Sequence, residues 1–382
     1  MTHPSLEYVL VACVAAGLTF LLTPLVRSVA IRWQAVALPR DRDVHAVATP
    51  RMGGAALFLG FAFALFVASR LPTLHGAFSE TGPRMGWVVG AGAVICAIGI
   101  IDDKWELDSL TKLAGQVLAT GLMVTLGGVQ LGTIYVPFEG GSTLSFDRNL
   151  GIPVTVLLTV LTINAMNFID GLDGLAAGVT VIAAGAFFVF SYHLTRDGYQ
   201  TVASAPSLIA VALAGACLGF LPHNFWPARI FMGDSGSMVV GLMLSAAATT
   251  ATTTADPQGF NQALGPLPLL LPFLPIAILA LPFVDLLLAV FRRASRGRSP
   301  FAPDKQHLHH RLLEMGHSHR RAVLLLYFWS ALLAFAGVGL SFDNGTWPVV
   351  LTLAGAAAVG VLVVVLPSRR TRPDAGAPRP AR

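Results

Sequence analysis

Acidic residues occur in three short polar segments of an otherwise apolar chain. The segments contain Asp102 and Asp103, Asp170 and Asp173, and Asp234, each set beside glycine or asparagine. Carboxylate and amide oxygens are the ligands that hard divalent cations prefer, and Mg²⁺ is the usual partner of phosphates. If the three segments meet, the pattern predicts a magnesium site that Mn²⁺ could also occupy.

A simpler interpretation is that these acids only cap helices. Asp is a favoured N-cap residue, and Asp234 before Ser-Gly fits that role by itself. Asp102 and Asp103 fit it poorly, because they end an apolar run, where a carboxylate opposes the helix macrodipole. Both interpretations stay open for any one segment, but the recurrence of Asn and Asp in Gly-rich turns favours the cation site.

A fourth polar segment is rich in arginine and histidine. Its charged and imidazole groups are Arg292, Arg293, Arg296, Arg298, Asp304, Lys305, His307, His309 and His310. The histidines have no cysteine partner and lack the spacing of a structural zinc site. Guanidinium and imidazole groups together suit a diphosphate, so the segment is predicted to bind an anion. The alternative for the arginines is a membrane anchor without a ligand.

Two other places carry basic groups that could contact a phosphate. The first polar loop contains Arg42 and His45 ahead of Gly53-Gly54, and Lys112 begins another apolar run. Lys112 is close enough in sequence to reach the same surface as Asp102. Its alternative role is that of an ordinary snorkelling lysine.

The composition indicates what must position these groups. Of 382 residues, 54% are apolar and 12% are charged, and the mean hydropathy is +0.69. Soluble domains have roughly 25% charged residues. These values exclude a soluble enzyme and a disordered chain, and they argue against a nucleic-acid partner despite the net charge of +5. We expect an all-α, polytopic membrane protein surrounded by membrane lipids.

About eleven apolar windows are suited to membrane-spanning helices. They cover residues 7–27, 53–71, 85–101, 110–128, 151–166, 174–194, 206–221, 235–252, 266–291, 322–341 and 347–366. Prolines crowd the ninth window, so we expect that helix to be kinked or broken. Residues 1–367 then form one membrane domain, and residues 368–382 form a basic, Pro-rich, disordered tail.

The basic residues predict the orientation. With the N-terminus outside, all but four of the 25 Lys and Arg residues face the cytoplasm, as the positive-inside rule requires. Eleven spans also place the C-terminus and all four polar segments on the cytoplasmic side. A transporter is the alternative from a different class, but it would place ionisable groups near the membrane midplane, often on inverted repeats.

In this order the polar segments resemble one family, the polyprenyl-phosphate N-acetylhexosamine-1-phosphate transferases of glycosyltransferase family 4. The similar stretches are Asp41–Gly54, Gly99–Gln116, Asn164–Gly178, Pro227–Gly241 and Arg292–Leu312. The last stretch contains Ser-Pro-Phe-Ala-Pro-Asp followed by His-Leu-His-His, which resembles the WecA-like branch. MraY-like members tend to carry three adjacent histidines there, and a lysine where this chain has His45.

The resemblance implies a reaction and a location. N-acetylglucosamine 1-phosphate would pass from UDP-N-acetylglucosamine to a polyprenyl phosphate (undecaprenyl or decaprenyl), with release of UMP. This would be the first lipid-linked step of a cell-envelope polysaccharide, at the cytoplasmic face of the bacterial cytoplasmic membrane. The alternative within the family is an MraY-like phospho-N-acetylmuramoyl-pentapeptide transferase. The oligomeric state is left open, with a homodimer as one alternative.

The resemblance also implies roles for individual residues. The Mg²⁺ ligands would be Asp234 and, second, Asn167. Asp102 and Asp103 would orient or deprotonate the acceptor phosphate, while Asp170 and Asp173 would complete the metal and nucleotide environment. The substrate-binding residues would be Arg42, His45, Lys112, Arg293, His307, His309 and His310.

Overall fold

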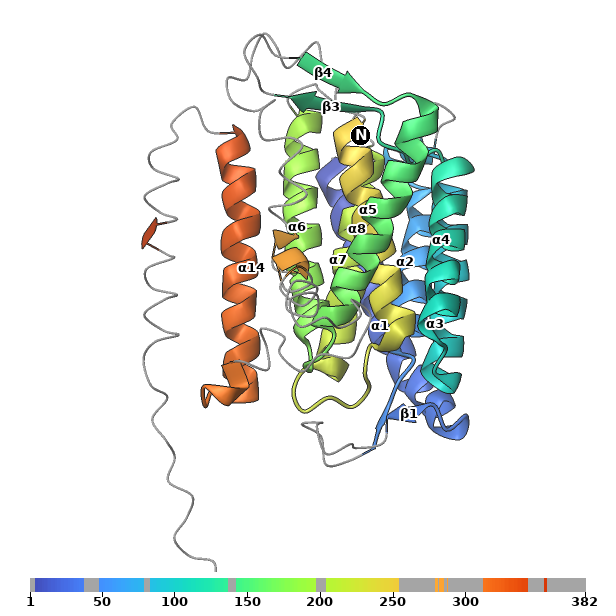
Figure 1. The fold of residues 1–382 in the computed structure, drawn as a ribbon, viewed down its shortest axis with the longest axis vertical. Helices are drawn as coiled ribbons and strands as arrows, with labels where there is room; N and C mark the ends of the chain where they lie inside the picture. The colour runs from blue at the N-terminus through green and yellow to red at the C-terminus, as the bar shows by residue number, and fades with distance from the viewer. Residues whose placement is uncertain are drawn as a thin grey trace, which may run out of the picture.

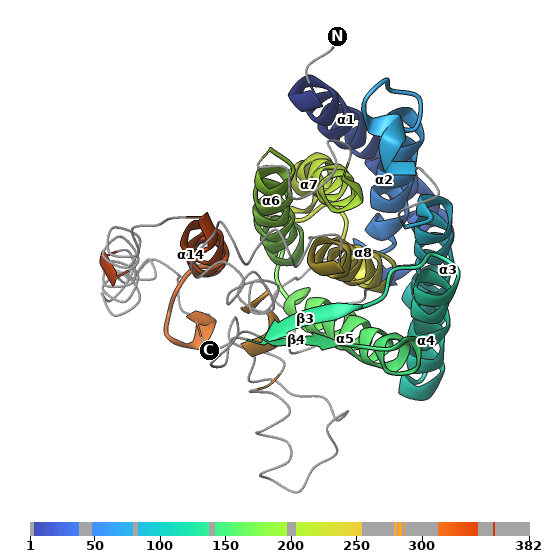
Figure 2. The ribbon, with the colours of Figure 1, turned by 90° about the horizontal axis from the view of Figure 1, so that it is seen from above.

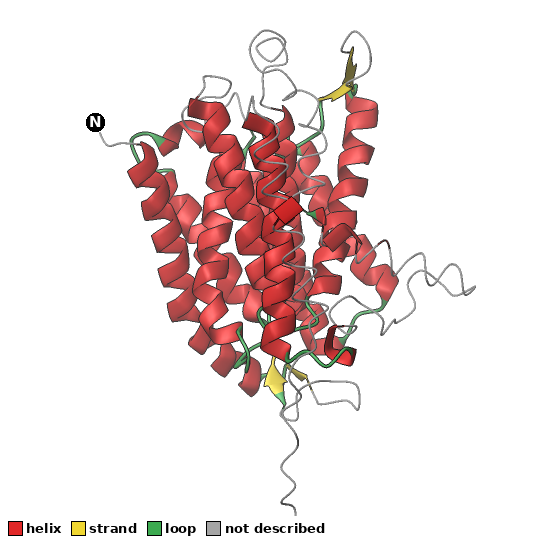
Figure 3. Ribbon diagram, turned by 90° about the vertical axis from the view of Figure 1, so that its left-hand side faces the viewer, coloured by secondary structure: helices red, strands yellow, loops and turns green. Residues whose placement is uncertain are grey.

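The computed structural model of the chain describes residues 4–37, 48–78, 83–136, 142–196, 204–253, 279–280, 282–284, 287, 312–342 and 354–355. Long helices dominate it and run roughly side by side (Figure 3). They are α1 (Pro4–Arg32), α2 (Gly53–Ala68), α3 (Met85–Trp105), α4 (Ser109–Thr125), α5 (Arg148–Ile169), α6 (Leu175–Arg196), α7 (Ala205–Asn224), α8 (Gly233–Thr253) and α14 (His319–Phe342). A 3-10 helix, η1 (Leu74–Phe78), follows α2.

These nine helices coincide with nine of the predicted windows. Six of them, namely α1, α3, α5, α6, α7 and α14, are long and apolar enough to cross a membrane, and α2 is apolar but shorter. The chain is therefore a multi-span, all-α membrane protein. The ninth window and the eleventh lie almost wholly outside the described residues, as does the tail. The kink, the count of eleven and the orientation therefore stay predictions.

Two small sheets were not anticipated. Strands β1 (Val36–Ala37) and β2 (Thr49–Pro50) pair antiparallel, as do β3 (Thr133–Val136) and β4 (Ser142–Ser145), with Thr133 opposite Ser145. The second pair has a sequence signal, because Thr-Ile-Tyr-Val is rich in β-branched and aromatic residues and Gly-Gly precedes the return strand. Hydropathy windows of helical length do not detect such short strands.

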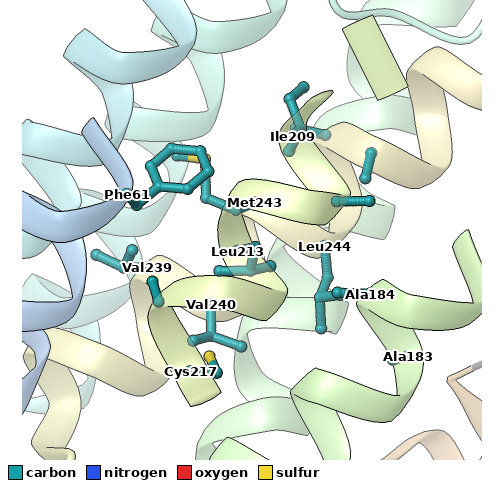
Figure 4. Packing of buried hydrophobic residues seen from close by; sticks show 14 of the residues in the cluster. Phe61, Ala183, Ala184, Ile209, Leu213, Cys217, Val239, Val240, Met243 and Leu244 are labelled. Atoms are coloured by element: carbon teal, nitrogen blue, oxygen red, sulfur yellow. The ribbon is translucent and has the colours of Figure 1, made fainter. Parts of the chain in front are cut away.

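Helix α8 lies at the centre of the bundle. It packs against α2, α3, α5, α6 and α7, and Figure 2 shows it ringed by other helices. From Ser235 to Ala251 its residues are buried all round, as expected for a central helix. Figure 4 shows this core, in which α8 contributes Val239, Val240, Met243 and Leu244 beside Leu213 and Cys217 of α7. A helix fixed this firmly can hold its first residues in a defined position.

Helix α1 has the opposite environment. Large apolar side chains along it, among them Leu6, Leu21 and Leu25, are more than half exposed. In a membrane protein such side chains face lipid, which is as apolar as the protein core. The bundle thus has a lipid-facing rim, to which α1 belongs, and a buried axis formed by α8.

Candidate active site

Four helix ends meet at the lower end of the bundle in Figure 1. Helices α3 and α5 end there, and α4 and α8 begin there, with contacts between α3 and α4, α3 and α8, α4 and α5, and α5 and α8. The three predicted acidic segments lie on these ends. The bundle therefore brings the segments together, as the cation-site hypothesis requires.

Lys112 connects two of the acids. Its Nζ lies 2.7 Å from Oδ2 of Asp102 and 3.3 Å from Oδ2 of Asp234. The Asp102 side chain is only 3% exposed, and its Oδ1 accepts a hydrogen bond from the Leu107 backbone N–H at 2.8 Å. The expectation that Lys112 reaches the surface of Asp102 is confirmed. Two carboxylates share this one ammonium group.

Asp234 is held from a third helix as well. Its Oδ1 accepts a hydrogen bond from Nδ2 of Asn167 on α5, and the same amide donates to Oγ of Ser237 at 3.0 Å. The described bonds of the Asp234 carboxylate thus run to Asp102 on α3, Lys112 on α4 and Asn167 on α5, and not to its own helix. The capping interpretation of Asp234 is wrong, and the predicted neighbourhood of Asn167 and Asp234 is confirmed.

Asp103 caps α8 in place of Asp234. Its Oδ1 accepts from the backbone N–H of Asp234 at 2.8 Å, and its Oδ2 accepts from that of Ser235 at 3.2 Å. This resolves the objection from the macrodipole, because the acid at the C-terminal end of α3 lies against the positive N-terminal end of α8. Asp103 was predicted to orient or deprotonate the acceptor phosphate, and that role stays a prediction. In the structure its oxygens hold the helix that carries Asp234.

Two glycines make this contact feasible. Gly233 has φ +71°, and a Cβ there would lie 2.5 Å from both Asp103 carboxylate oxygens. A Cβ on Gly99, one turn earlier in α3, would lie 2.3 Å from Cα of Ser235. The backbones of α3 and α8 therefore approach too closely for a side chain at position 99, and a side chain at position 233 would displace the Asp103 carboxylate.

Asp170 adds a further carboxyl group immediately after α5. Burial raises the pKa of Asp170 to about 8. The nearby carboxylates of Asp234, Asp103 and Asp173 also raise this pKa, whereas the positive charge of Arg51 lowers it. A carboxyl group in this position takes up a proton or a cation readily. Its role in the metal and nucleotide environment stays a prediction.

Asp173 has a different environment. Its Oδ2 accepts from the backbone N–H of Ala228 at 2.8 Å, and its own N–H donates to Nε2 of His319 on α14 at 3.1 Å. The next N–H, that of Gly174, donates to Oδ1 of Asn224 at 3.1 Å. Asp173 therefore fastens the α5–α6 turn to the segment before α8, and its predicted catalytic role stays a prediction.

Sequence reasoning missed several residues around this turn. The rings of Trp226 and His319 stack with centroids 4.2 Å apart, and Tyr327 donates to the Gly174 carbonyl. Trp226 and Asn224 lie in Leu-Pro-His-Asn-Phe-Trp-Pro, directly before a segment that was singled out. This density of polar and aromatic residues at a helix end was the available signal. No sequence signal pointed to His319 or Tyr327, because only the fold brings α14 to the α5–α6 turn.

The first polar loop reaches the same place through its backbone. The Phe231 N–H donates to the Pro50 carbonyl at 2.8 Å, and the N–H groups of Gly53 and Gly54 donate to the carbonyls of Phe231 and Met232 at 3.1 and 3.0 Å. The end of that loop is therefore fixed against the entry to α8. The other predicted substrate-binding residues, Arg42, His45, Arg293, His307, His309 and His310, lie outside the described residues.

The donor chemistry of the cluster fits Mg²⁺. Among the described residues no three His, Cys, Asp or Glu side chains form a ready metal cluster. Mg²⁺ does not need one, because it commonly binds one or two carboxylates together with waters and substrate phosphates. Asp234 offers a carboxylate that is 21% exposed. The acidic side chains around it outnumber the single positive charge of Lys112. Asn167 must turn its amide to offer oxygen, since its Nδ2 faces Asp234.

Comparison with known proteins gives consistent matches. Residues 85–252 match the model of glycosyl transferase family 4. The chain is 50% identical over 381 residues to a decaprenyl-phosphate N-acetylglucosaminephosphotransferase of Mycolicibacterium smegmatis, covering 99% of this chain and 92% of the relative. It is 35% identical to a probable undecaprenyl-phosphate N-acetylglucosaminyl 1-phosphate transferase of Bacillus subtilis, covering 87% and 85%. It is 32% identical to a phospho-N-acetylmuramoyl-pentapeptide-transferase of Desulforudis audaxviator, covering 87% and 98%.

Proposed function

The chain belongs to glycosyl transferase family 4 and is a membrane-embedded transferase, and from this premise we propose that it moves N-acetylglucosamine 1-phosphate from UDP-N-acetylglucosamine to a polyprenyl phosphate. The observation that carries the proposal is the cluster of Asp102, Lys112, Asn167 and Asp234 where four helix ends meet. Decaprenyl phosphate is the favoured acceptor, because the relative named for it shares 50% identity and the one named for undecaprenyl phosphate 35%.

The reaction joins two anions, so the site must position them and offset their charge. A non-bridging oxygen of the lipid phosphate attacks the phosphorus that carries the sugar. A new P–O–P bond forms, the bond from that phosphorus to the UMP oxygen breaks, and UMP leaves. The product is polyprenyl-diphospho-N-acetylglucosamine, which would be the first lipid-linked intermediate of an envelope polysaccharide. Single displacement is favoured over a phospho-aspartyl intermediate.

Asp234 would hold the cation, with Asn167 as its neighbour from α5. Mg²⁺ supplies positive charge for the diphosphate when it is bound. Lys112, anchored on Asp102, lies within reach of the same region and would contact a phosphate oxygen. Asp103 keeps the first turn of α8, and so Asp234, in place.

Asp102 would contribute little to the rate as a general base. The second pKa of a phosphate monoester is near 6, so at pH 7 most of the acceptor is already a dianion. Its buried carboxylate, paired with Lys112, is better suited to orient that ammonium group. This assigns Asp102 a positioning task and makes its amide variant informative.

Two alternatives make different predictions. An MraY-like enzyme would use a UDP-muramoyl-pentapeptide donor, and the relative of that name shares 32% identity, against 50% for the decaprenyl-phosphate N-acetylglucosaminephosphotransferase. A transporter would need its ionisable groups near the midplane, whereas this cluster lies at helix ends. The location on the cytoplasmic face of the bacterial cytoplasmic membrane rests on the distribution of Lys and Arg.

The test is transfer by the purified full chain in detergent with Mg²⁺, decaprenyl phosphate and radiolabelled UDP-N-acetylglucosamine. Label should enter the organic phase as UMP appears. Asp234→Ala should lower the rate at least about 100-fold, as expected for loss of a group that stabilises transition-state charge. Asp102→Asn should lower the rate less than about tenfold, whereas loss of a general base typically lowers the rate by roughly 10²- to 10⁴-fold.

Asp108→Asn is the matched control for both changes. Asp108 lies at the same end of the bundle, but among the residues that the structure describes its carboxylate accepts only from the first turn of α4, at Leu110 and Thr111. Asn caps a helix as well as Asp, so the rate should be unchanged. Transfer from UDP-muramoyl-pentapeptide alone would assign the chain to the other branch, and transfer from neither donor would refute the proposal.

A further inference from the structure

We propose that Lys112 and the divalent cation compete for Asp234, so that the ammonium group neutralises this carboxylate until the cation displaces it. The proposal rests on the proposed function, in which Asp234 holds Mg²⁺. It gives Lys112 a role before substrate arrives, in addition to contact with a phosphate.

The contacts of Asp234 carry the first step of the argument. Nζ of Lys112 is 3.3 Å from Oδ2, and Nδ2 of Asn167 donates to Oδ1. Both oxygens of the carboxylate thus already have a hydrogen-bond donor. Each oxygen keeps a second lone pair that Mg²⁺ can use, but the cation then binds beside a hydrogen-bond donor that is already in place.

The charge of Lys112 makes it the donor that must move. An ammonium group and a divalent cation on one carboxylate would be only a few ångströms apart, and at that distance their repulsion is strong in a partly buried site. Asn167 is neutral, and rotation of its terminal amide would exchange Nδ2 for Oδ1 without loss of charge. The two donors therefore respond differently to the cation, one by leaving and the other by turning.

The second contact of Lys112 shows where the ammonium group stays. It lies closer to Asp102, at 2.7 Å, and the Asp102 side chain is almost fully buried. A buried carboxylate without a counter-ion is costly, so Asp102 retains Lys112 when Asp234 releases it. Asp108 fixes the first turn of α4 beneath Lys112, while a quarter of the lysine side chain remains exposed. The ammonium group can therefore swing away from Asp234 and toward a phosphate without leaving Asp102.

The consequence is an unusual separation of binding and turnover. Removing the charge of Lys112 should tighten the binding of the metal and at the same time slow transfer. A lysine that only supports the local fold, or one that only contacts phosphate, would not tighten metal binding when it is removed.

The test measures Mn²⁺ alone, without substrate, on the purified full chain in detergent. The EPR signal of free Mn²⁺ gives the bound fraction, and the melting temperature as a function of Mg²⁺ concentration gives a second measure. Lys112→Gln should bind Mn²⁺ about tenfold more tightly, the size of effect that one adjacent charge has on a carboxylate. Its transfer rate should fall at least tenfold.

Two variants control for fold and charge. Lys112→Arg keeps the charge and can bridge both carboxylates with its fork, so its affinity for Mn²⁺ should not rise. Lys104→Gln removes a lysine from the end of α3, where its Nζ donates to the Trp33 carbonyl, and should leave Mn²⁺ affinity unchanged. If Lys112→Gln does not fold, a weaker Mn²⁺ affinity in Lys112→Arg than in the wild type supports the exchange, and a tighter one refutes it.

The outcomes separate this proposal from the one before it. Unchanged or weaker Mn²⁺ binding in folded Lys112→Gln overturns the competition and leaves the proposed reaction intact. A wild-type protein that transfers label but binds no Mn²⁺ overturns both the metal site and the competition. A protein that binds Mn²⁺ with the predicted pattern but transfers no label keeps the exchange and refutes the reaction.

Discussion

Buried carboxylates stabilise both ends of this bundle, but the two ends use them differently. At the upper end in Figure 1, Glu7 near the start of α1 accepts from the Thr73 N–H, the Thr73 hydroxyl and the Leu74 N–H, at 2.9–3.2 Å. This one carboxylate caps η1. At the lower end, Asp102 and Asp234 share a single ammonium group, and Asp170 lies nearby.

The difference indicates which end can bind a cation. A carboxylate whose oxygens take several backbone N–H bonds is stabilised in place without a counter-ion. Carboxylates that share too little positive charge take up a proton or a cation instead. Asp103 belongs to the lower end by position and resembles Glu7 in its bonding, because it holds two backbone N–H groups. The acids therefore differ in their bonding as well as in their position: Glu7 and Asp103 accept from backbone N–H groups, whereas Asp102 and Asp234 share Lys112.

Asp103→Ala should give the largest effect of the variants that test this division. It leaves two N–H groups of α8 without an acceptor and frees the first turn that carries Asp234. A displacement of about 1 Å at a reacting group can cost 100-fold in rate, and loss of an N-cap costs about 1–2 kcal/mol of stability. We expect transfer to fall about 100-fold and the Mg²⁺ concentration for half-maximal rate to rise.

The Mg²⁺ dependence distinguishes positioning from direct contact with the acceptor. If Asp103 touched the lipid phosphate, the KM for polyprenyl phosphate would rise while the Mg²⁺ dependence stayed constant. That result would group Asp103 with Asp102 and Asp234, the acids that share one ammonium group, and would contradict the comparison. Asp108→Asn again serves as the control, since it changes a carboxylate at the same end of the bundle.

Gly233→Ala tests the same contact from the side of α8 and should have a smaller effect. The left-handed backbone at Gly233 costs an alanine about 1–2 kcal/mol, and the new Cβ would meet the Asp103 carboxylate. The Asp103 side chain can move aside, so we expect transfer to fall about tenfold together with a lower melting temperature. Gly90→Ala in α3 is the matched control, because a Cβ there meets no atom within 4 Å. Equal activity of the two variants would show that the α8 entry tolerates displacement.

The sequence predicted the components of this site better than their bonding. Helix windows and the order of the polar segments were enough to place Lys112 beside Asp102, since only a short turn separates α3 from α4. The pairing of Asn167 with Asp234 was predicted from the resemblance to the family. Local spacing therefore predicted the first contact, and the resemblance predicted the second.

What the sequence could not predict depends on packing between helices that are distant in the chain. Asp103 reaches α8 across 131 residues, and His319 reaches Asp173 across 146. Adjacent acids at Asp102 and Asp103 look equivalent in the sequence, but neighbouring positions on a helix point about 100° apart. One therefore faces Lys112 and the other α8. The β3–β4 hairpin was missed because a search for helical spans has no sensitivity to four-residue strands.

Glu7→Gln should give the smallest effect on transfer and a clear effect on stability. An amide keeps one acceptor oxygen, but its NH₂ then faces a backbone N–H of η1, so at least one bond is lost, at about 1–3 kcal/mol. The melting temperature should fall by a few degrees. The rate of the folded fraction should match the wild type, because the change lies at the end of the bundle opposite to the cluster.

Thr73→Val, which removes only the hydroxyl donor to Glu7, should lower the melting temperature less. A loss of transfer in Glu7→Gln as large as that in Asp103→Ala, at equal folded fraction, would mean that the two ends of the bundle are coupled and that bonding alone does not separate structural acids from functional ones.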